Sequence, residues 1–109
     1  MNKVKQLYYL SWLCAYTGRK FRAGIAYFLD DKGEYRLRLD AYAADRPLYL
    51  KAVSMTGDLI KYRLEACYRG NNGKHRDCVG TGQTIAGDKQ PIYINMGPGF
   101  RTLVMEQAN

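Results

Sequence analysis

The sequence is poor in the residues that usually build catalytic and metal sites. It has 3 cysteines and 1 histidine in 109 residues. Cys14, Cys67 and Cys78 form no Cys-x-x-Cys pair, and their spacing from His75 fits no usual zinc site. An odd number of cysteines also argues against a fully disulfide-bonded secreted scaffold. We therefore expect no metal, no cofactor and reduced thiols in a cytoplasmic protein.

Carboxylates are also few, with 10 Asp and Glu against 17 Lys and Arg. Asp30-Asp31 falls in a predicted turn, so paired acid and base catalysis has no visible site. His75 and Cys78 would face opposite sides of a strand and cannot form a nucleophile and base pair. The glycine-rich stretches 80–82 and 97–99 lack the helix and the Lys-Ser/Thr of a phosphate loop. These absences predict a protein without catalytic residues.

Long apolar runs are absent too. The longest, near Leu7–Tyr16, is too short to span a bilayer, so we expect no membrane partner. Lys3 and Lys5 before it imitate a secretory signal, but no clear cleavage site follows, and a first buried strand explains the segment better. The hydrophobic fraction of 47% predicts one folded domain over residues 1–109.

What the chain does have is tyrosine, 10 in all, in stretches that alternate with a period of two. Both features predict strands. Residues 21–29 and 35–41, joined by Asp31-Lys32-Gly33, predict a hairpin with a three-residue loop. Residues 59–69 and 74–82 predict a second hairpin, with a two-residue loop at Asn72-Gly73.

A short motif then occurs twice, as Pro-Leu-Tyr-Leu at 47–50 and Pro-Ile-Tyr-Ile at 91–94. Each copy follows a hairpin, which predicts an internal pseudo-repeat of 21–50 and 62–94. Further strands are predicted at Leu48–Val53, Ile92–Met96 and Arg101–Glu106, with 54–58 as the linker between the halves. The expected fold is all-β, with about eight short antiparallel strands in a small barrel or sandwich. Because each half has too few strands for a core, the halves must share one, within a chain or by exchange in a homodimer.

The predicted register of the first hairpin places Asp30 opposite Glu34. Its core face then holds Ala23, Ile25, Tyr27, Leu29, Tyr35, Leu37, Leu39 and Ala41. On the outer face, Phe28 lies directly across from Arg36, with Arg38 beside it. An exposed aromatic ring next to paired arginines is typical of surfaces that stack bases and bind phosphates. The alternative is that another segment covers Phe28.

In the second hairpin the predicted register places Arg69 opposite Arg76, a like-charged pair that an anion would stabilise. Lys61, Arg63 and Lys74 extend the positive field; alternatively, the arginines are screened by solvent and splay apart. The same register places Cys67 opposite Cys78, within disulfide reach, although free thiols are favoured in the cytosol.

A formal net charge of +7 favours an anionic partner, unless the charge serves only solubility. Because no recognition helix is predicted, single-stranded DNA or RNA is the expected ligand. The predicted nucleic-acid-binding residues are Phe28, Arg36, Arg38, Lys61, Arg63, Lys74, Arg69 and Arg76. Two alternatives stay open. One is an inhibitor or adaptor that binds an acidic or nucleic-acid-binding host protein complex. The other is a structural homodimer with an aromatic interface.

The run Phe21-Arg-Ala-Gly-Ile-Ala-Tyr27, then Gly33, Leu37-Arg-Leu-Asp-Ala41 and Arg46-Pro-Leu-Tyr-Leu50, resembles a module of small β-rich proteins from plasmids, phages and integrative elements. The module reads approximately Ile-Gly-x-Ala, Gly-Lys-Gly, Leu-Asp-Ala and Gly-Arg-x-x-Leu. This chain departs from it by Glu34-Tyr35 after the turn glycine and by Arg46-Pro47 in place of Gly-Arg. The resemblance transfers no site residues. It implies a mobile-element origin, where small basic proteins tend to bind nucleic acid or to block host defence.

Overall fold

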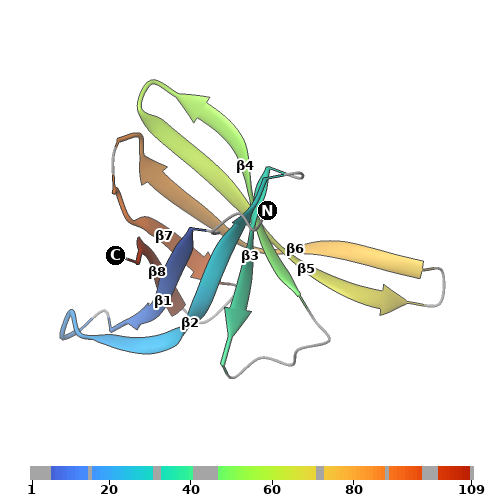
Figure 1. Ribbon diagram of the computed structural model, residues 1–109, viewed down its shortest axis with the longest axis horizontal. Coiled ribbons are helices and arrows are strands. Elements are labelled where there is room, and N and C mark those ends of the chain that lie inside the picture. Colours follow the sequence, from blue (N-terminus) through green and yellow to red (C-terminus); the bar gives the residue numbers. More distant parts are fainter. Residues whose placement is uncertain are drawn as a thin grey trace, which may run out of the picture.

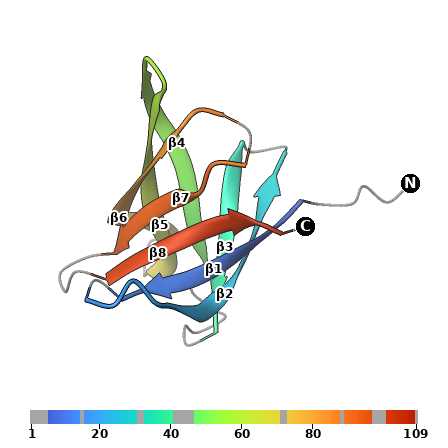
Figure 2. The same cartoon turned by 90° about the vertical axis from the view of Figure 1, so that its left-hand side faces the viewer.

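The computed structural model describes residues 6–14, 16–30, 33–40, 47–70, 73–87, 89–96 and 101–108, with the backbone alone at 68–70 and 101. Its eight antiparallel strands form a closed barrel in chain order, which confirms the predicted fold class (Figures 1 and 2). The strands are β1 (Leu7–Leu13), β2 (Lys20–Leu29), β3 (Glu34–Leu39), β4 (Leu48–Thr56), β5 (Leu59–Gly70), β6 (Gly73–Ile85), β7 (Ile92–Met96) and β8 (Arg101–Gln107). Pairing of β1 with β8 closes the barrel. No helix in the described part of the chain is long and apolar enough to cross a membrane.

The core fills the inside of the barrel, because alternate residues of each strand point inward. In β7, for example, Ile92 and Ile94 are buried while Tyr93 and Asn95 are exposed. The fully buried aliphatic side chains are Leu10, Leu37, Leu48, Leu50, Leu64, Ile94, Leu103, Met105 and Val104. Val104 alone among them lies on the outer face, since Leu103 and Met105 on either side of it belong to the core.

The first hairpin has a different register from the predicted one. Its last pair is Leu29 with Glu34, so four residues, 30–33, connect the strands rather than three. Gly33 has a positive φ of 66° and donates its N–H to the Leu29 carbonyl. The one-residue shift turns Gly24 and Ala26 inward, and it moves Ile25, Tyr27 and Leu29, predicted for the core, to the outer face. The prediction for β3 is confirmed at Leu37 and Leu39, whereas Ala41 lies outside the described residues.

The second hairpin is also shifted. Gly70 pairs with Gly73, so the two-residue loop is 71–72, which lies outside the described residues, and not Asn72-Gly73. The register shifts again between Leu64 and Glu65, where Val79 is the extra residue of a β-bulge. Tyr62 and Leu64 of β5 are buried in the core.

Part of this hairpin extends beyond the barrel, and we call it the arm: residues 67–70 of β5 and 73–79 of β6. The pairing of β5 with β4 ends at Ala66, and that of β6 with β7 begins at Gly80, so within the arm each strand pairs only with the other. Figure 1 shows the arm leaving the barrel on its own. A β-bulge bends a strand and increases its twist, which accounts for the departure at Val79.

The segment 54–58 is not the predicted linker. β4 continues to Thr56, Gly57 adopts a positive φ of 60°, and β5 begins at Leu59, so the segment belongs to a third hairpin. Residues 21–50 contain most of β2, all of β3 and the first three residues of β4, and residues 62–94 contain most of β5, all of β6 and the first three residues of β7. The repeated Pro-x-Tyr-x motifs therefore lie at corresponding places, at the starts of β4 and β7.

Candidate functional site

The predicted site around Phe28 is wrong, because the register shift places that ring inside the barrel. Phe28 lies opposite Tyr35 and packs edge-on against its ring at a centroid distance of 4.9 Å. Tyr35 also contacts Tyr8 at 5.3 Å and Tyr62 at 6.4 Å. Burial among these rings raises the pKa of Tyr35 well above its ordinary value. Phe28 is therefore partly buried in an aromatic cluster with Tyr35, and it does not lie across from Arg36 as predicted.

Arg36 does reach an aromatic ring on the outer face, but the ring is that of Tyr49. Arg36 pairs with Tyr49 across β3 and β4, and its guanidinium carbon lies 5.9 Å from the ring centroid. Arg76, from the arm, lies over the same ring at 4.1 Å. The two guanidinium groups leave Tyr49 only 9% exposed, although it points away from the core.

Arg76 is tied to the barrel by carboxylates. It donates two hydrogen bonds of 3.0 Å to Glu34, at the start of β3, and a weaker one of 3.5 Å to Glu65. Glu34 is 4% exposed, so this bidentate pair is partly buried. The hydrogen bond to Glu34 is the main reason that the pKa of Arg76 is raised. The predicted Arg69–Arg76 pair is also wrong, since Arg69 pairs with Lys74 and Arg76 with Cys67.

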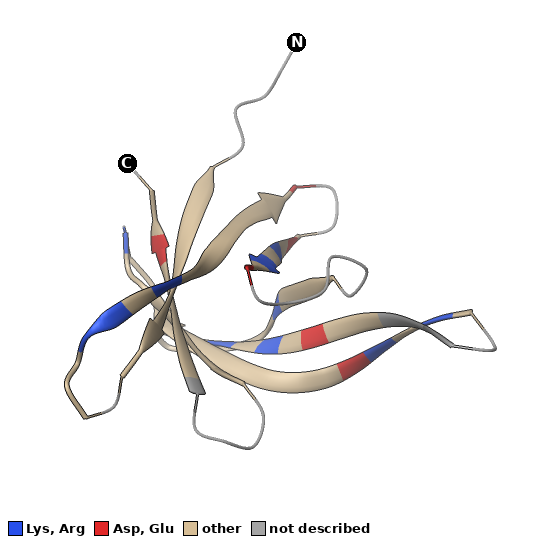
Figure 3. Cartoon of the chain, turned by 90° about the horizontal axis from the view of Figure 1, so that it is seen from below, with Lys and Arg blue, Asp and Glu red and all other residues tan. Residues whose placement is uncertain are grey.

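The other predicted cations are distributed around the molecule. Arg38 is exposed on β3 and Lys74 is exposed on the arm, while the side chain of Arg69 lies outside the described part. Lys61 and Arg63 remain together on the outer face of β5. Arg63 bonds Glu65 at 3.1 Å, and the ribbon of the β5–β6 hairpin carries both basic and acidic positions (Figure 3). Of the predicted binding residues whose side chains are described, only Lys61 and Arg63 form part of a continuous exposed face.

The cysteines are separate. Cys67 lies opposite Arg76, and Cys78 lies opposite Glu65, so the predicted Cys67–Cys78 pairing is wrong and both are free thiols. Cys14, in the turn after β1, is free as well, and its pKa is lowered chiefly by a hydrogen bond from the Thr17 hydroxyl. Among the described residues, no group of three or more His, Cys, Asp and Glu side chains could hold a metal ion.

The outer face of β5, β6 and β7 forms a continuous exposed surface, which we call the polar face. Two rows cross it, because Lys61 lies beside Gln83 and Tyr93, and Arg63 lies beside Thr81 and Asn95. All six side chains are exposed, and none is acidic. Lys51 of β4 extends the second row, since it pairs with Arg63. The face thus offers cations on β4 and β5, one amide and one hydroxyl on β6, and one amide and an aromatic ring that is 45% exposed, Tyr93, on β7.

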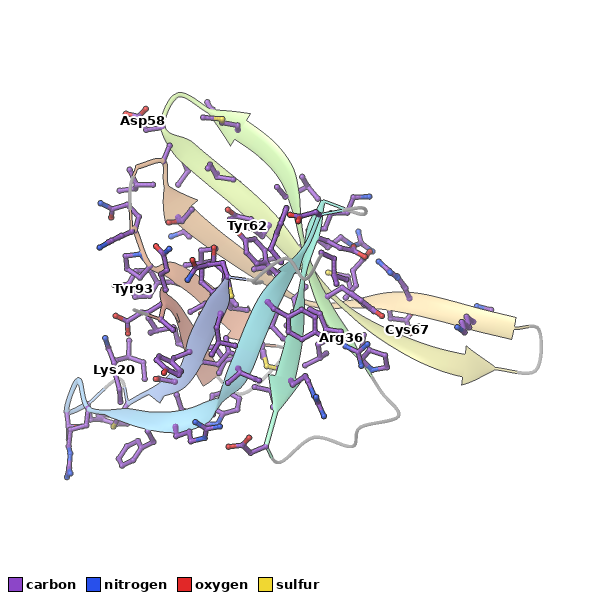
Figure 4. All side chains as sticks on the ribbon, viewed as in Figure 1. Lys20, Arg36, Asp58, Tyr62, Cys67 and Tyr93 are labelled. Carbon is purple, nitrogen blue, oxygen red and sulfur yellow. The ribbon has the colours of Figure 1, made fainter. Side chains whose placement is uncertain are left out.

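A further cation lies on the far side of Tyr93. Lys20, at the start of β2, reaches across β1 to bond Glu106 of β8 at 2.7 Å. The pKa of Lys20 is raised mainly by that hydrogen bond, and the Tyr93 hydroxyl contributes in the same direction. Figure 4 shows Lys20 and Tyr93 on one side of the barrel and Arg36 on the other. Tyr93 therefore lies between Lys20 and the β4–β5 cations.

The sequence contained one signal for this surface, the repeated Pro-x-Tyr-x motif, which places Tyr49 and Tyr93 at the same position of each copy. The strand register was needed to bring Tyr93 beside Gln83 and Lys61. Comparison of the chain with protein-family models, with curated proteins and with solved structures finds no match.

Proposed function

We propose that the protein is a non-catalytic binder of single-stranded nucleic acid and that the polar face is its contact surface. The observation that carries the proposal is the exposed ring of Tyr93 among amide side chains, with Lys51, Lys61 and Arg63 on one side. Sequence-tolerant binding of single strands uses aromatic rings for base stacking and cations for phosphates. The net charge of +7 supports a polyanion as the ligand.

The internal repeat gives a second argument for Tyr93 as the stacking ring. Tyr49 and Tyr93 occupy the same place in the two copies of the motif, and both point outward. In the first copy two planar guanidinium groups lie over the ring of Tyr49. In the second copy the ring is 45% exposed, and no cation–π contact to it is seen among the described residues. A planar group can therefore stack on Tyr93 as guanidinium groups do on Tyr49.

The test measures binding of a labelled single-stranded oligonucleotide by fluorescence anisotropy over a series of salt concentrations. Tyr93→Ala should weaken binding by about tenfold or more, the cost of one lost base stack. Lys61→Gln should reduce the slope of log affinity against log salt by about 0.7, the value for one phosphate contact on a single strand. The proposal would be refuted by absence of binding at low salt, or by an affinity that does not change with salt concentration.

Two variants serve as matched controls. Tyr16→Ala removes a tyrosine that is 98% exposed but lies in the β1–β2 turn, away from the polar face. Arg38→Gln removes an exposed strand cation from β3, where the sequence had predicted the site. Both should bind as the parent protein does. If Tyr16→Ala weakened binding as much as Tyr93→Ala, the ligand would not be placed by the polar face.

The arm supports a second candidate function, binding of a host protein as an inhibitor or adaptor. Residues 73–79 of β6, before Gly80, pair only with β5. One edge of this segment therefore has backbone N–H and C=O groups without a strand partner. Such an edge can add a strand from another protein. Replacing Val79 by proline would block an added strand at this edge. A host-protein complex that survives nuclease treatment, and that this variant loses, is the expected result; recovery of nucleic acid alone would refute it.

A further inference from the structure

A shallow groove runs along the outer face beside the polar face, over β8, β1 and β2. Its volume is about 560 Å³, and Tyr9, Leu10, Ser11, Arg22, Gly24, Glu106 and Gln107 line it. This volume is within the usual range for small-molecule sites. In the register, Tyr9 lies directly beside Glu106, and Ser11 lies directly beside Arg22. Figure 2 shows β8, β1 and β2 side by side on this side of the barrel.

The groove combines a stacking ring with hydrogen-bonding groups of both kinds. Tyr9 is 49% exposed, so its ring offers a surface for stacking. Oε1 of Glu106 accepts a hydrogen bond from Lys20, and Oε2 accepts none from the described residues. Arg22 uses its Nε for Asp40 at 3.0 Å, so the Nη donors of its guanidinium group are available to a ligand.

We infer that this groove is a nucleotide-binding site that prefers guanine. A carboxylate only accepts hydrogen bonds. Guanine is the base whose Watson–Crick edge presents two adjacent donors, N1–H and the N2 amino group, whereas adenine and cytosine place an acceptor next to their single amino group. Glu106 therefore favours guanine, the ring of Tyr9 provides the stacking surface, and the Nη donors of Arg22 bind the phosphate.

The inference rests on the proposed nucleic-acid binding and sharpens it, because the groove continues the polar face. Glu106 lies on the strand next to Tyr93, and Lys20 lies near both side chains. A strand that crosses Tyr93 can therefore continue over β8 and place a later base over Tyr9. The groove adds base preference to a surface that otherwise has none.

The test uses free nucleotides, so that it does not depend on binding of a long strand. GMP, IMP and AMP are titrated into the full chain, and amide shifts of Ser11 and Gln107 are followed by NMR. GMP should bind at least about tenfold more tightly than AMP, and IMP, which lacks the N2 amino group, should fall between them. Glu106→Gln should remove the preference for GMP, and Tyr9→Ala should weaken all three nucleotides. Tyr16→Ala is the control and should change nothing.

Equal affinity for GMP and AMP, or no saturable shift with GMP, would overturn the inference. The outcome separates the two proposals. Salt-dependent oligonucleotide binding that needs Tyr93 but shows no guanine preference would leave the polar face in place and refute the groove. GMP binding by a protein that does not bind oligonucleotides would support the groove and refute the proposed function.

Discussion

The ion pair between Arg76 and Glu34 should hold the arm against the barrel, and its removal should cost measurable stability. Arg76→Met keeps the length of the side chain but leaves the carboxylate of Glu34, 4% exposed, without its two 3.0 Å hydrogen bonds. Loss of a partner from a fully buried pair costs about 3 to 5 kcal/mol. Arg76 is itself 34% exposed, and Lys51, the cross-strand neighbour of Glu34, can move toward the carboxylate. We therefore expect a loss of about 2 kcal/mol in the free energy of unfolding.

The measurement is denaturant unfolding of Arg76→Met beside Arg63→Met, which breaks an exposed pair with Glu65. The control should lose less than about 0.5 kcal/mol, because exposed ion pairs contribute little. The double variant Glu34→Gln with Arg76→Met should be more stable than the sum of the two single losses predicts, by at least about 1 kcal/mol. Equal losses in Arg76→Met and Arg63→Met, or strictly additive losses in the double variant, would refute the reasoning.

Three further predictions follow from the barrel. Gly24→Ala should be severely destabilised, by more than about 3 kcal/mol, because its Cβ would overlap the backbone carbonyl of Arg38. Gly82→Ala should cost clearly less in the same unfolding assay, since its Cβ would meet only side chains at 3.4 Å. Burial raises the pKa of Tyr35, so its contribution to stability is complete below the ordinary tyrosine pKa of about 10 and is lost as the pH rises further. Phenolate absorbance and unfolding measured together should show this tyrosine ionise last. Mild oxidation should form no intramolecular Cys67–Cys78 bond, and alkylation with mass spectrometry should still find both thiols.

The strands could be predicted from the sequence because they depend on local pattern. Alternation of apolar residues located both hairpins, and the prolines at 47 and 91 marked the starts of β4 and β7. The number of strands and the absence of predicted helices favoured a small barrel or a sandwich, and only the pairing of β1 with β8 decides for the barrel. These features need no information on which residue faces which.

The register could not be predicted, and the site depended on it. Gly33 fits a three-residue loop and a four-residue loop equally well, but the observed four-residue loop turns Phe28 inward. Asn72-Gly73 is a strong turn signal, yet the strands close around 71–72 because Gly73 is already paired with Gly70. Bulges such as the one at Val79 have no clear mark in the sequence and shift every residue beyond them. A shift of one residue exchanges the inner and outer faces, so an error in one loop changes the whole candidate surface.

Arg76 shows why net charge alone does not locate a binding surface. Its guanidinium group is occupied by Glu34, Glu65 and the ring of Tyr49, so it offers little to an external anion. Lys51 and Lys61, in contrast, form no ion pair with the described residues. Both are exposed on the outer face of neighbouring strands, so their positive potentials add. We therefore expect a polyanion to be attracted more strongly to the β4–β5 edge of the polar face than to the arm.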